Sequence, residues 1–131
     1  MMKTKKNSLM MLLASFLFLG CGSPAQEGLS TIDAEQLKKL NTDEVILLDV
    51  RTPAEWEQGR IKNAILINYR DSNFREQVAA LDSEKPVIVY CAAGGRSTGA
   101  SKVLQDAGFK TIYNYTGGFS DWKSKGEEII K

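Results

Sequence analysis

One cysteine in this sequence lies where a nucleophile would be expected. Cys91 directly follows the apolar run 87–90 and opens a loop of small residues, Cys91-Ala92-Ala93-Gly94-Gly95-Arg96. Such a loop can curl so that several backbone N–H groups point inward and bind an anion. The dipole of a helix expected after Arg96, and the charge of Arg96 itself, also favour thiolate over thiol. The sequence therefore predicts sulfur chemistry at Cys91, against the alternative that Cys91 is a small, inert, buried residue.

The absence of histidine excludes several kinds of site. With no His in 131 residues, the chain has no Ser–His–Asp triad, no Cys–His pair and no imidazole ligand for a metal. Two cysteines are too few for a cysteine-rich zinc site. Any chemistry must therefore use a thiol, carboxylates, hydroxyls, Lys, Arg or backbone dipoles, and we expect neither a metal nor an organic cofactor.

The net charge of +1 combines two unlike regions. Lys3, Lys5 and Lys6 lie among the first twenty residues, which contain no acidic residue, and the remaining chain carries 14 basic against 16 acidic side chains. Nucleic-acid binding calls for a basic patch, and this balance does not suggest one. We expect no nucleic-acid partner.

The first 21 residues have the pattern of a targeting segment. The three lysines precede a mostly apolar stretch over residues 9–19, shorter than the roughly 20 residues that a membrane-spanning helix needs. Gly20 and Cys21 follow, in an order that resembles a bacterial lipoprotein signal peptide in which the cysteine is acylated. Phe18 and Leu19 depart from the usual residues before that cysteine, so an ordinary secretory signal or an uncleaved anchor is the alternative. With Cys21 acylated, Cys91 is the one thiol of the mature chain.

After a short tether over 22–28, the sequence predicts one domain over 29–131 in which strands and helices alternate. Continuous apolar runs at 45–48 and 87–90 are typical of strands buried on both faces of a sheet. Asp33 and Thr52 are predicted N-caps, and the latter begins a capping box with Pro at the first helical position. The expected strands are 31–32, 45–48, 64–67, 87–90 and 111–115, and the expected helices are 34–40, one from 53, 73–81, 97–107 and 119–125. This alternation predicts an α/β fold with a central, mostly parallel sheet of about five strands and helices on both faces.

Three motifs in order resemble the rhodanese family of sulfurtransferases over about residues 29–125. The segment 91–97 is similar to the family's active-site loop, Cys-x-x-Gly-x-Arg-Ser/Thr. The segments 49–51, 55–56 and 59–61 are similar to its Asp-Val-Arg, Glu-Trp/Phe and Gly-His-Ile elements, with Arg60 in place of the histidine. The segment 116–119 with Trp122 is similar to its closing Gly-Gly…Trp motif.

The resemblance implies that Cys91 accepts a sulfane sulfur as a persulfide and passes it to a second nucleophile. It implies that the backbone N–H groups of residues 92–96 cradle the terminal sulfur. Four residues separate Cys91 from Arg96, the length found in sulfur-transferring members, whereas arsenate- and phosphate-handling relatives have one more. The implied substrates are a small anion such as thiosulfate and a thiol or cyanide-like acceptor.

Three further residues have two interpretations each. Asp49 and Arg51 flank the end of a predicted strand near the loop, where they would either orient a substrate or form an ion pair that braces the loop with Arg96. Arg60 would either line the mouth of the pocket and attract an anionic donor or belong to an exposed charged loop.

The sequence thus predicts a rhodanese-type sulfurtransferase, exported and anchored by lipid on Cys21 to a bacterial cell envelope. The alternative hypothesis is a non-catalytic module of the same fold that binds or regulates an envelope partner, since fold alone does not determine function. A thiol redox enzyme is disfavoured because a resolving cysteine is lacking. The sequence does not identify a protein partner.

Overall fold

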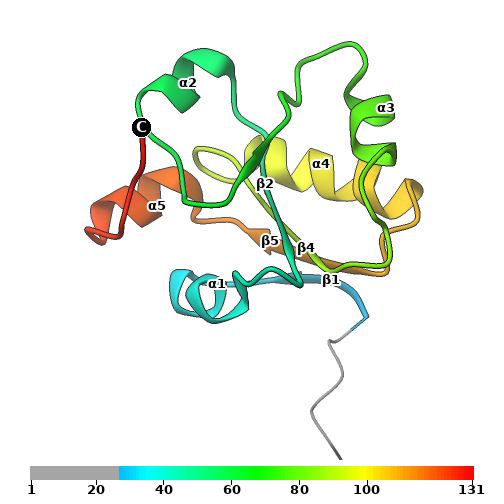
Figure 1. Cartoon of the computed structure of the whole chain (residues 1–131), viewed down its shortest axis with the longest axis horizontal. Coiled ribbons are helices and arrows are strands. Elements are labelled where there is room, and N and C mark those ends of the chain that lie inside the picture. Colours follow the sequence, from blue (N-terminus) through cyan, green and yellow to red (C-terminus); the bar gives the residue numbers. More distant parts are fainter. Residues whose placement is uncertain (1–26) are drawn as a thin grey trace, which may run out of the picture.

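The computed structural model describes residues 27–131 (Figure 1). The predicted signal segment with its Cys21, and most of the predicted tether, lie outside the described residues. Five strands form one sheet in the order β1-β5-β4-β2-β3, and every neighbouring pair is parallel. The predicted α/β architecture is confirmed.

Helices and strands alternate along the chain, as predicted. The strands are β1 (Gly28–Thr31), β2 (Ile46–Asp49), β3 (Ile65–Leu66), β4 (Val87–Tyr90) and β5 (Thr111–Tyr115). The helices are α1 (Ala34–Leu40), α2 (Pro53–Glu57), α3 (Phe74–Ala79), α4 (Gly95–Asp106) and α5 (Gly118–Ser124). Within residues 27–131, no helix combines the length and the apolar character needed to cross a membrane.

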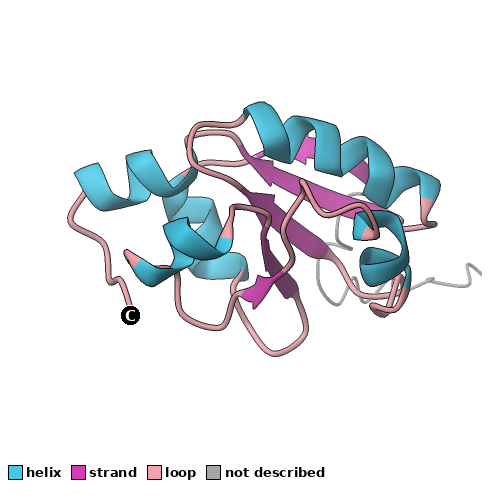
Figure 2. Cartoon of the chain, turned by 90° about the horizontal axis from the view of Figure 1, so that it is seen from above, coloured by secondary structure: helices cyan, strands magenta, loops and turns pink. Residues whose placement is uncertain are grey.

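Helices cover both faces of the sheet (Figure 2). On one face α3 and α4 pack through residues such as Phe74, Val78 and Leu104. On the other face α1 and α5 pack through residues such as Leu37 and Trp122. Strands β2, β4 and β5 lie between these two apolar layers and are buried along their whole length, which explains the apolar runs at 46–48 and 87–90.

Two short helices begin where local sequence predicts them. The Asp33 carboxylate accepts the Gln36 N–H at 2.8 Å, and the Gln36 side chain accepts the Asp33 N–H at 2.9 Å, which completes a capping box for α1. At α2, Thr52 and Glu55 form the second capping box, and Pro53 occupies the first helical position. These contacts involve residues only three apart, so the local sequence is sufficient to specify them.

Several element boundaries differ from prediction. β1 runs from Gly28 to Thr31 rather than over 31–32 and so begins within the predicted tether, because it pairs in register with Thr111 to Asn114 of β5. β3 is shorter than the predicted 64–67, and α5 begins and ends one residue earlier than the predicted 119–125. β2 runs from Ile46 to Asp49 rather than over 45–48, because its residues pair in register with Val87 to Tyr90 of β4. α4 begins at Gly95 rather than at residue 97, because Gly94 has a positive φ of 99° and its carbonyl accepts the Thr98 N–H at 3.1 Å. α3 is shorter at both ends than the predicted 73–81.

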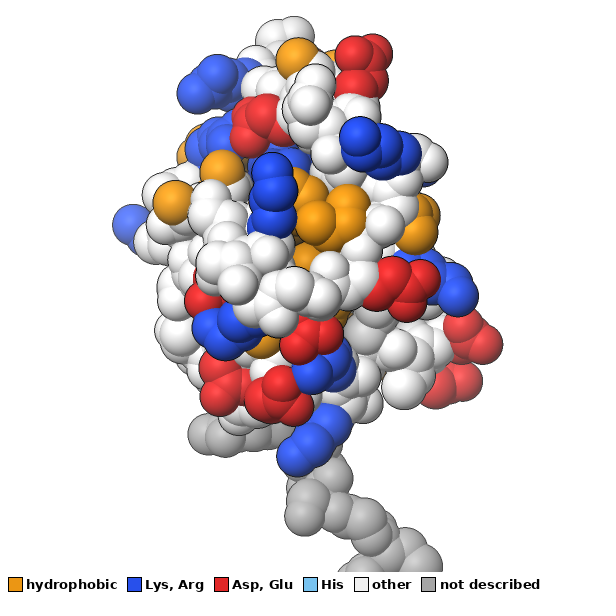
Figure 3. Space-filling model, turned by 90° about the vertical axis from the view of Figure 1, so that its left-hand side faces the viewer, with side chains coloured by type: hydrophobic (Ala, Val, Ile, Leu, Met, Phe, Trp, Pro, Cys, Tyr) orange, Lys and Arg blue, Asp and Glu red, His pale blue; other side chains and the backbone are white. Residues whose placement is uncertain are grey.

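All five strands point the same way, so their carboxyl ends meet at one edge of the sheet. The loop after β4, the start of α5 and helix α2 come together at this edge, at the left of Figure 1. The molecular face on that side carries acidic and basic side chains interspersed around a small apolar centre (Figure 3). Its electric field is therefore mixed in sign rather than uniformly positive.

Candidate active site

Cys91 lies at the carboxyl end of β4, where open α/β sheets bind their ligands. Its side chain is buried, with 1% of its surface exposed, while Ala93 and Gly95 of the same loop are exposed. The Gly94 N–H donates to the Cys91 Sγ at 3.1 Å. The structure therefore places the sulfur inside a loop of small residues with a backbone donor directed at it.

The start of α5 holds the carbonyl groups of the loop away from the sulfur. The Phe119 N–H donates to the Cys91 carbonyl at 2.8 Å, and the Ser120 N–H donates to the Ala92 carbonyl at 3.0 Å. Gly118 permits this approach: it has a φ of 65°, and a Cβ there would lie 2.5 Å from the Cys91 carbonyl oxygen. With these carbonyls bound to α5, backbone N–H groups are left to face the sulfur.

The backbone conformation at position 94 and the lack of space for a side chain both require glycine there. Its φ of 99° lies in the left-handed region, and an added Cβ would lie 2.7 Å from the Thr116 carbonyl oxygen. The loop therefore packs directly against the backbone that precedes α5. This contact explains why the glycine of the predicted motif stands at this position.

Hydrogen bonds around Cys91 favour its thiolate. Burial raises the pKa of a thiol, but the backbone and hydroxyl of Ser97 and the N–H groups of Gly94 and Ala93 together lower the pKa of Cys91 below its ordinary value. Ser97 is the third residue of α4, where unpaired N–H groups at a helix start favour an anion. The sequence predicted this effect from the loop, the helix dipole and Arg96, and gave no indication of the part played by the Ser97 hydroxyl.

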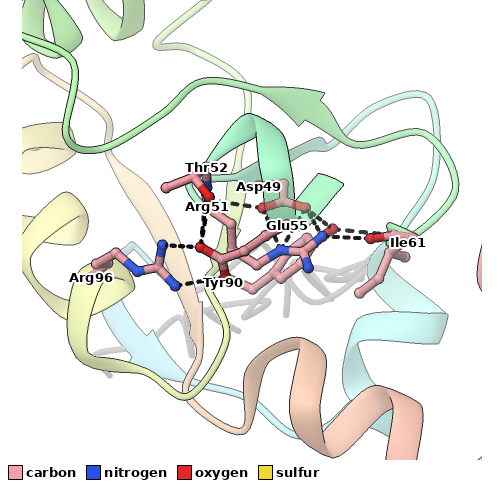
Figure 4. A network of polar contacts seen from close by, with 8 residues as sticks. Asp49, Arg51, Thr52, Glu55, Ile61, Tyr90 and Arg96 are labelled. Carbon is pink, nitrogen blue, oxygen red and sulfur yellow. Dashed lines mark hydrogen bonds and ion pairs between the residues drawn. The ribbon is translucent and has the colours of Figure 1, made fainter. Parts of the chain in front are cut away.

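Asp49 and Arg51 form an ion pair in the interior rather than at a substrate surface (Figure 4). Their side chains are 0% and 2% exposed, and the Arg51 Nη2 lies 2.7 Å from the Asp49 Oδ2. The Asp49 carboxylate also accepts the Tyr90 hydroxyl at 2.7 Å, and Arg51 donates to the Gly59 carbonyl at 2.8 Å. The Tyr90 hydroxyl in turn accepts the Ile61 N–H at 3.2 Å. This burial rules out direct contact of either charged residue with substrate in this conformation, and favours a structural ion pair over a substrate-orienting one.

The partner of Arg96 differs from the predicted one. Its guanidinium binds both oxygens of Glu55, at 2.7 and 2.9 Å, and not Asp49 or Arg51 (Figure 4). Glu55 also accepts the Thr52 hydroxyl at 3.0 Å. Arg96 was assigned the wrong partner because Glu55 lies on α2, forty-one positions earlier in the chain, and only the tertiary fold brings the two together.

Arg60 is anchored through its backbone. Its N–H and carbonyl exchange hydrogen bonds with Ile130 at 2.8 and 2.9 Å, which ties the C-terminal segment to the loop after α2. The side chain of Arg60 is half-buried. These backbone contacts show a structural role for the segment and leave the predicted attraction of an anionic donor as a hypothesis.

Comparison with known proteins identifies the family to which this chain belongs. The sequence profile of the Rhodanese-like domain matches residues 33–125. The chain belongs to the rhodanese-like family. Within residues 27–131, this rhodanese-like chain has no cluster of three or more His, Cys, Asp or Glu side chains arranged to hold a metal ion.

Relatives of this rhodanese-like chain include sulfurtransferases. A sulfurtransferase of Allochromatium vinosum is 33% identical over 101 residues, covering 76% of this chain and 92% of the relative. A thiosulfate sulfurtransferase of Coxiella burnetii is 33% identical over 96 residues, covering 73% and 86%.

Solved structures of the family have the same fold. A rhodanese-related protein of Thermoplasma volcanium superimposes with a TM-score of 0.68 at 34% identity, covering 76% of this chain and 96% of that protein. The polysulfide-sulfur transferase homodimer of Wolinella succinogenes gives a TM-score of 0.66 at 32% identity, covering 78% of each chain.

Replacement of Asp49 tests the buried ion pair. We expect Asp49→Asn to lower the free energy of unfolding by about 3–5 kcal/mol, because it leaves the buried charge of Arg51 without its counter-ion. Denaturant unfolding of the variant and the parent measures this difference. The exposed Asp43 supplies the control Asp43→Asn, and a loss no larger than in that control would contradict the assignment.

Replacement of Glu55 tests the bond to Arg96 through its pH dependence. The Arg96 guanidinium lowers the pKa of Glu55 to about 2 from its ordinary 4.5, so the ionised form stabilises the fold. The parent should be more stable than Glu55→Gln by about 1 kcal/mol above pH 4.5, an advantage that is lost as the pH falls toward 2. Unfolding curves across this range measure the difference. Glu57→Gln, an exposed change in the same helix, should show no such dependence.

Proposed function

We propose that this chain is a sulfurtransferase that carries a sulfane sulfur as a persulfide on Cys91. The observation that supports this most directly is the Gly94 N–H aimed at the Cys91 Sγ, within a loop whose Cys91 and Ala92 carbonyls are bound by α5. The named activity of the Coxiella burnetii relative supports thiosulfate as one donor.

In the first step, the Cys91 thiolate attacks the outer, sulfane sulfur of thiosulfate. A new S–S bond forms to Cys91, the S–S bond of thiosulfate breaks, and sulfite leaves with the electron pair. The product on the enzyme is a persulfide whose terminal sulfur is an anion. The backbone N–H groups of residues 92–96 would hold that sulfur, since they favour negative charge at this position.

In the second step, a nucleophilic acceptor such as cyanide or a thiolate attacks the terminal sulfur. The bond from that sulfur to the Cys91 Sγ breaks, and its electron pair returns to Cys91 as the thiolate. Cyanide would leave as thiocyanate, and a thiolate would leave as a persulfide. No metal or organic cofactor enters either step.

The burial of Cys91 bears on how an acceptor reaches the sulfur. Only 1% of the residue is exposed, but an added sulfur atom extends about 2 Å beyond Sγ. The loop bears only methyl groups or hydrogens at positions 92–95, so the side chains of these four residues leave room for that extension. The persulfide would therefore present a more accessible atom than the resting thiol.

The test uses the full chain, purified in detergent, and measures its intact mass after incubation with thiosulfate. We expect a gain of one sulfur atom that is reversed by cyanide with release of thiocyanate. Cys91→Ser should gain no sulfur, because an alcohol at this position is a far weaker nucleophile. Its thermal unfolding curve should stay close to that of the parent, which shows that the loss is chemical.

Two results would count against the proposal. Sulfur uptake that persists in Cys91→Ser would place the nucleophile elsewhere. An unchanged mass in the parent, with Cys91 shown to be reduced and also slow to alkylate near neutral pH, would favour the non-catalytic binding module.

We further propose that the chain is an exported lipoprotein anchored to a bacterial cell envelope through Cys21. The support is the order of the first 21 residues, in which three lysines, an apolar stretch and Gly20 precede the cysteine. Anchoring would keep the rhodanese-like domain at a membrane surface, joined to it by the segment 22–28.

The anchor is tested by expressing the full chain in a bacterium that acylates lipoproteins. We expect the mass of the mature chain to include acyl groups on Cys21, and the protein to partition with the membrane fraction. Cys21→Ala should abolish both, whereas Cys91→Ser should change neither. An unmodified soluble chain would contradict the proposal and favour an ordinary secretory signal.

A further inference from the structure

Gly94 links the sulfur to the start of α4. Its N–H donates to the Cys91 Sγ, and its carbonyl accepts three hydrogen bonds from α4. The donors are the Thr98 hydroxyl at 2.7 Å, the Thr98 N–H at 3.1 Å and the Ser97 hydroxyl at 3.2 Å. The carbonyl belongs to the peptide that joins Gly94 to Gly95, so these three bonds fix the plane of that peptide, and the Thr98 hydroxyl makes the shortest of them.

Asn114 sets the direction in which the Thr98 hydroxyl points. The Asn114 Nδ2 lies 3.2 Å from the Thr98 Oγ1 and donates to it. The Gly94 carbonyl carries no proton, so the Thr98 hydroxyl must donate there and accept from the Asn114 amide. The three groups form a chain of hydrogen bonds in one direction, in which each bond polarises the next.

The polar side chain of Asn114 is costly in its surroundings. Asn114 is 5% exposed in the central part of the sheet, and its Oδ1 is buried with no hydrogen-bond partner among the described residues. Ile112, two positions earlier in β5, belongs to the apolar cluster that packs against α4. A buried unpaired carbonyl is unfavourable, so packing alone does not account for an amide here. Among residues 27–131 the side chain of Asn114 makes one hydrogen bond, to Thr98, and this bond gives a reason for the amide.

Two hydroxyls compete for the Gly94 carbonyl, and one of them also serves the sulfur. The Ser97 hydroxyl donates to the Gly94 carbonyl at 3.2 Å and also helps to lower the pKa of the Cys91 thiol. A hydroxyl has one proton, which Ser97 gives to the Gly94 carbonyl in this structure. The shorter bond from Thr98, at 2.7 Å, would still satisfy that carbonyl if the Ser97 hydroxyl turned to the sulfur. The same contact orients the peptide between Gly94 and Gly95. The C=O and N–H of a trans peptide point in opposite directions, so the Gly95 N–H faces away from the helix interior and toward the loop.

We propose that Thr98, oriented by Asn114, is a positioning residue for the sulfur site at Cys91. Thr98 touches no reacting atom: it fixes the peptide between Gly94 and Gly95, and it would satisfy the carbonyl of that peptide if the Ser97 hydroxyl turned to the sulfur. This role rests on the proposed function, since it is the persulfide and the attacking thiolate that these donors would stabilise. It extends the site by two residues outside the loop motif, one on α4 and one on β5.

The test compares Thr98→Val, which keeps the shape and removes the hydroxyl, with Thr98→Ser, which keeps the hydroxyl. The rate of alkylation of Cys91 is measured against pH in the full chain, which gives the thiol pKa without any sulfur donor. We expect Thr98→Val to raise this pKa and to slow alkylation near neutral pH by roughly fivefold, the effect of one lost hydrogen bond. Thr98→Ser should restore values close to those of the parent. The rate of persulfide formation from thiosulfate should follow the same order.

Two further variants separate positioning from folding. Thr111→Val removes the same hydroxyl from a buried residue at the other end of β5, and should leave the pKa of Cys91 unchanged. Asn114→Leu removes the donor to Thr98 with little change in size, and should shift the pKa in the same direction as Thr98→Val by a smaller amount. If Thr98→Val fails to fold, Asn114→Leu gives the decisive measurement.

The outcomes distinguish this proposal from the proposed function. A parent chain that takes no sulfur from thiosulfate would count against the sulfurtransferase, while the alkylation profiles would still report whether Thr98 acts on Cys91. A pKa of Cys91 that is the same in the parent, Thr98→Val and Asn114→Leu would overturn the positioning role, whatever the activity.

Discussion

The guanidinium of Arg51 carries a full positive charge into the interior, and residues from four segments surround it. Asp49 at the end of β2 pairs with it, the Gly59 carbonyl accepts from it, and the rings of Phe119 and Tyr90 lie 4.0 and 5.8 Å from its central carbon. A buried charge is tolerated only when such partners are all in place, so this ion pair requires β2, β4, the loop after α2 and α5 to assemble together.

Phe119 connects the buried ion pair of Arg51 to the sulfur site. Its ring lies against Arg51, and its backbone N–H donates to the Cys91 carbonyl at 2.8 Å. Helix α5 is thereby held in the position from which it turns loop carbonyls away from the sulfur. The thiolate is favoured mainly by backbone and hydroxyl donors, since the charge of Arg96 is already paired with Glu55. Arg96 and Glu55 instead tie α2 to the start of α4.

The sequence predicted features that depend on neighbouring residues better than features that depend on residues far apart in the chain. The N-cap at Asp33 and the capping box that begins at Thr52 were predicted because they involve neighbouring residues. The limits of β2 were off by one residue because the strand pairs with β4 about forty positions later. The start of α4 was placed too late because Gly94 takes a left-handed conformation that a bond to Thr98 supports.

The sequence by itself determined the α/β alternation, the loop at Cys91 and the resemblance to the rhodanese-like family, because apolar runs, caps and a contiguous motif are local properties. Only the tertiary structure decided that Arg96 binds Glu55, that Asp49 and Arg51 are buried with Tyr90, and that Asn114 reaches the sulfur site through Thr98. Each of these features joins side chains from different strands and helices. Several partners of suitable charge or polarity exist along the chain, and the choice among them follows from which elements the packed sheet brings into contact.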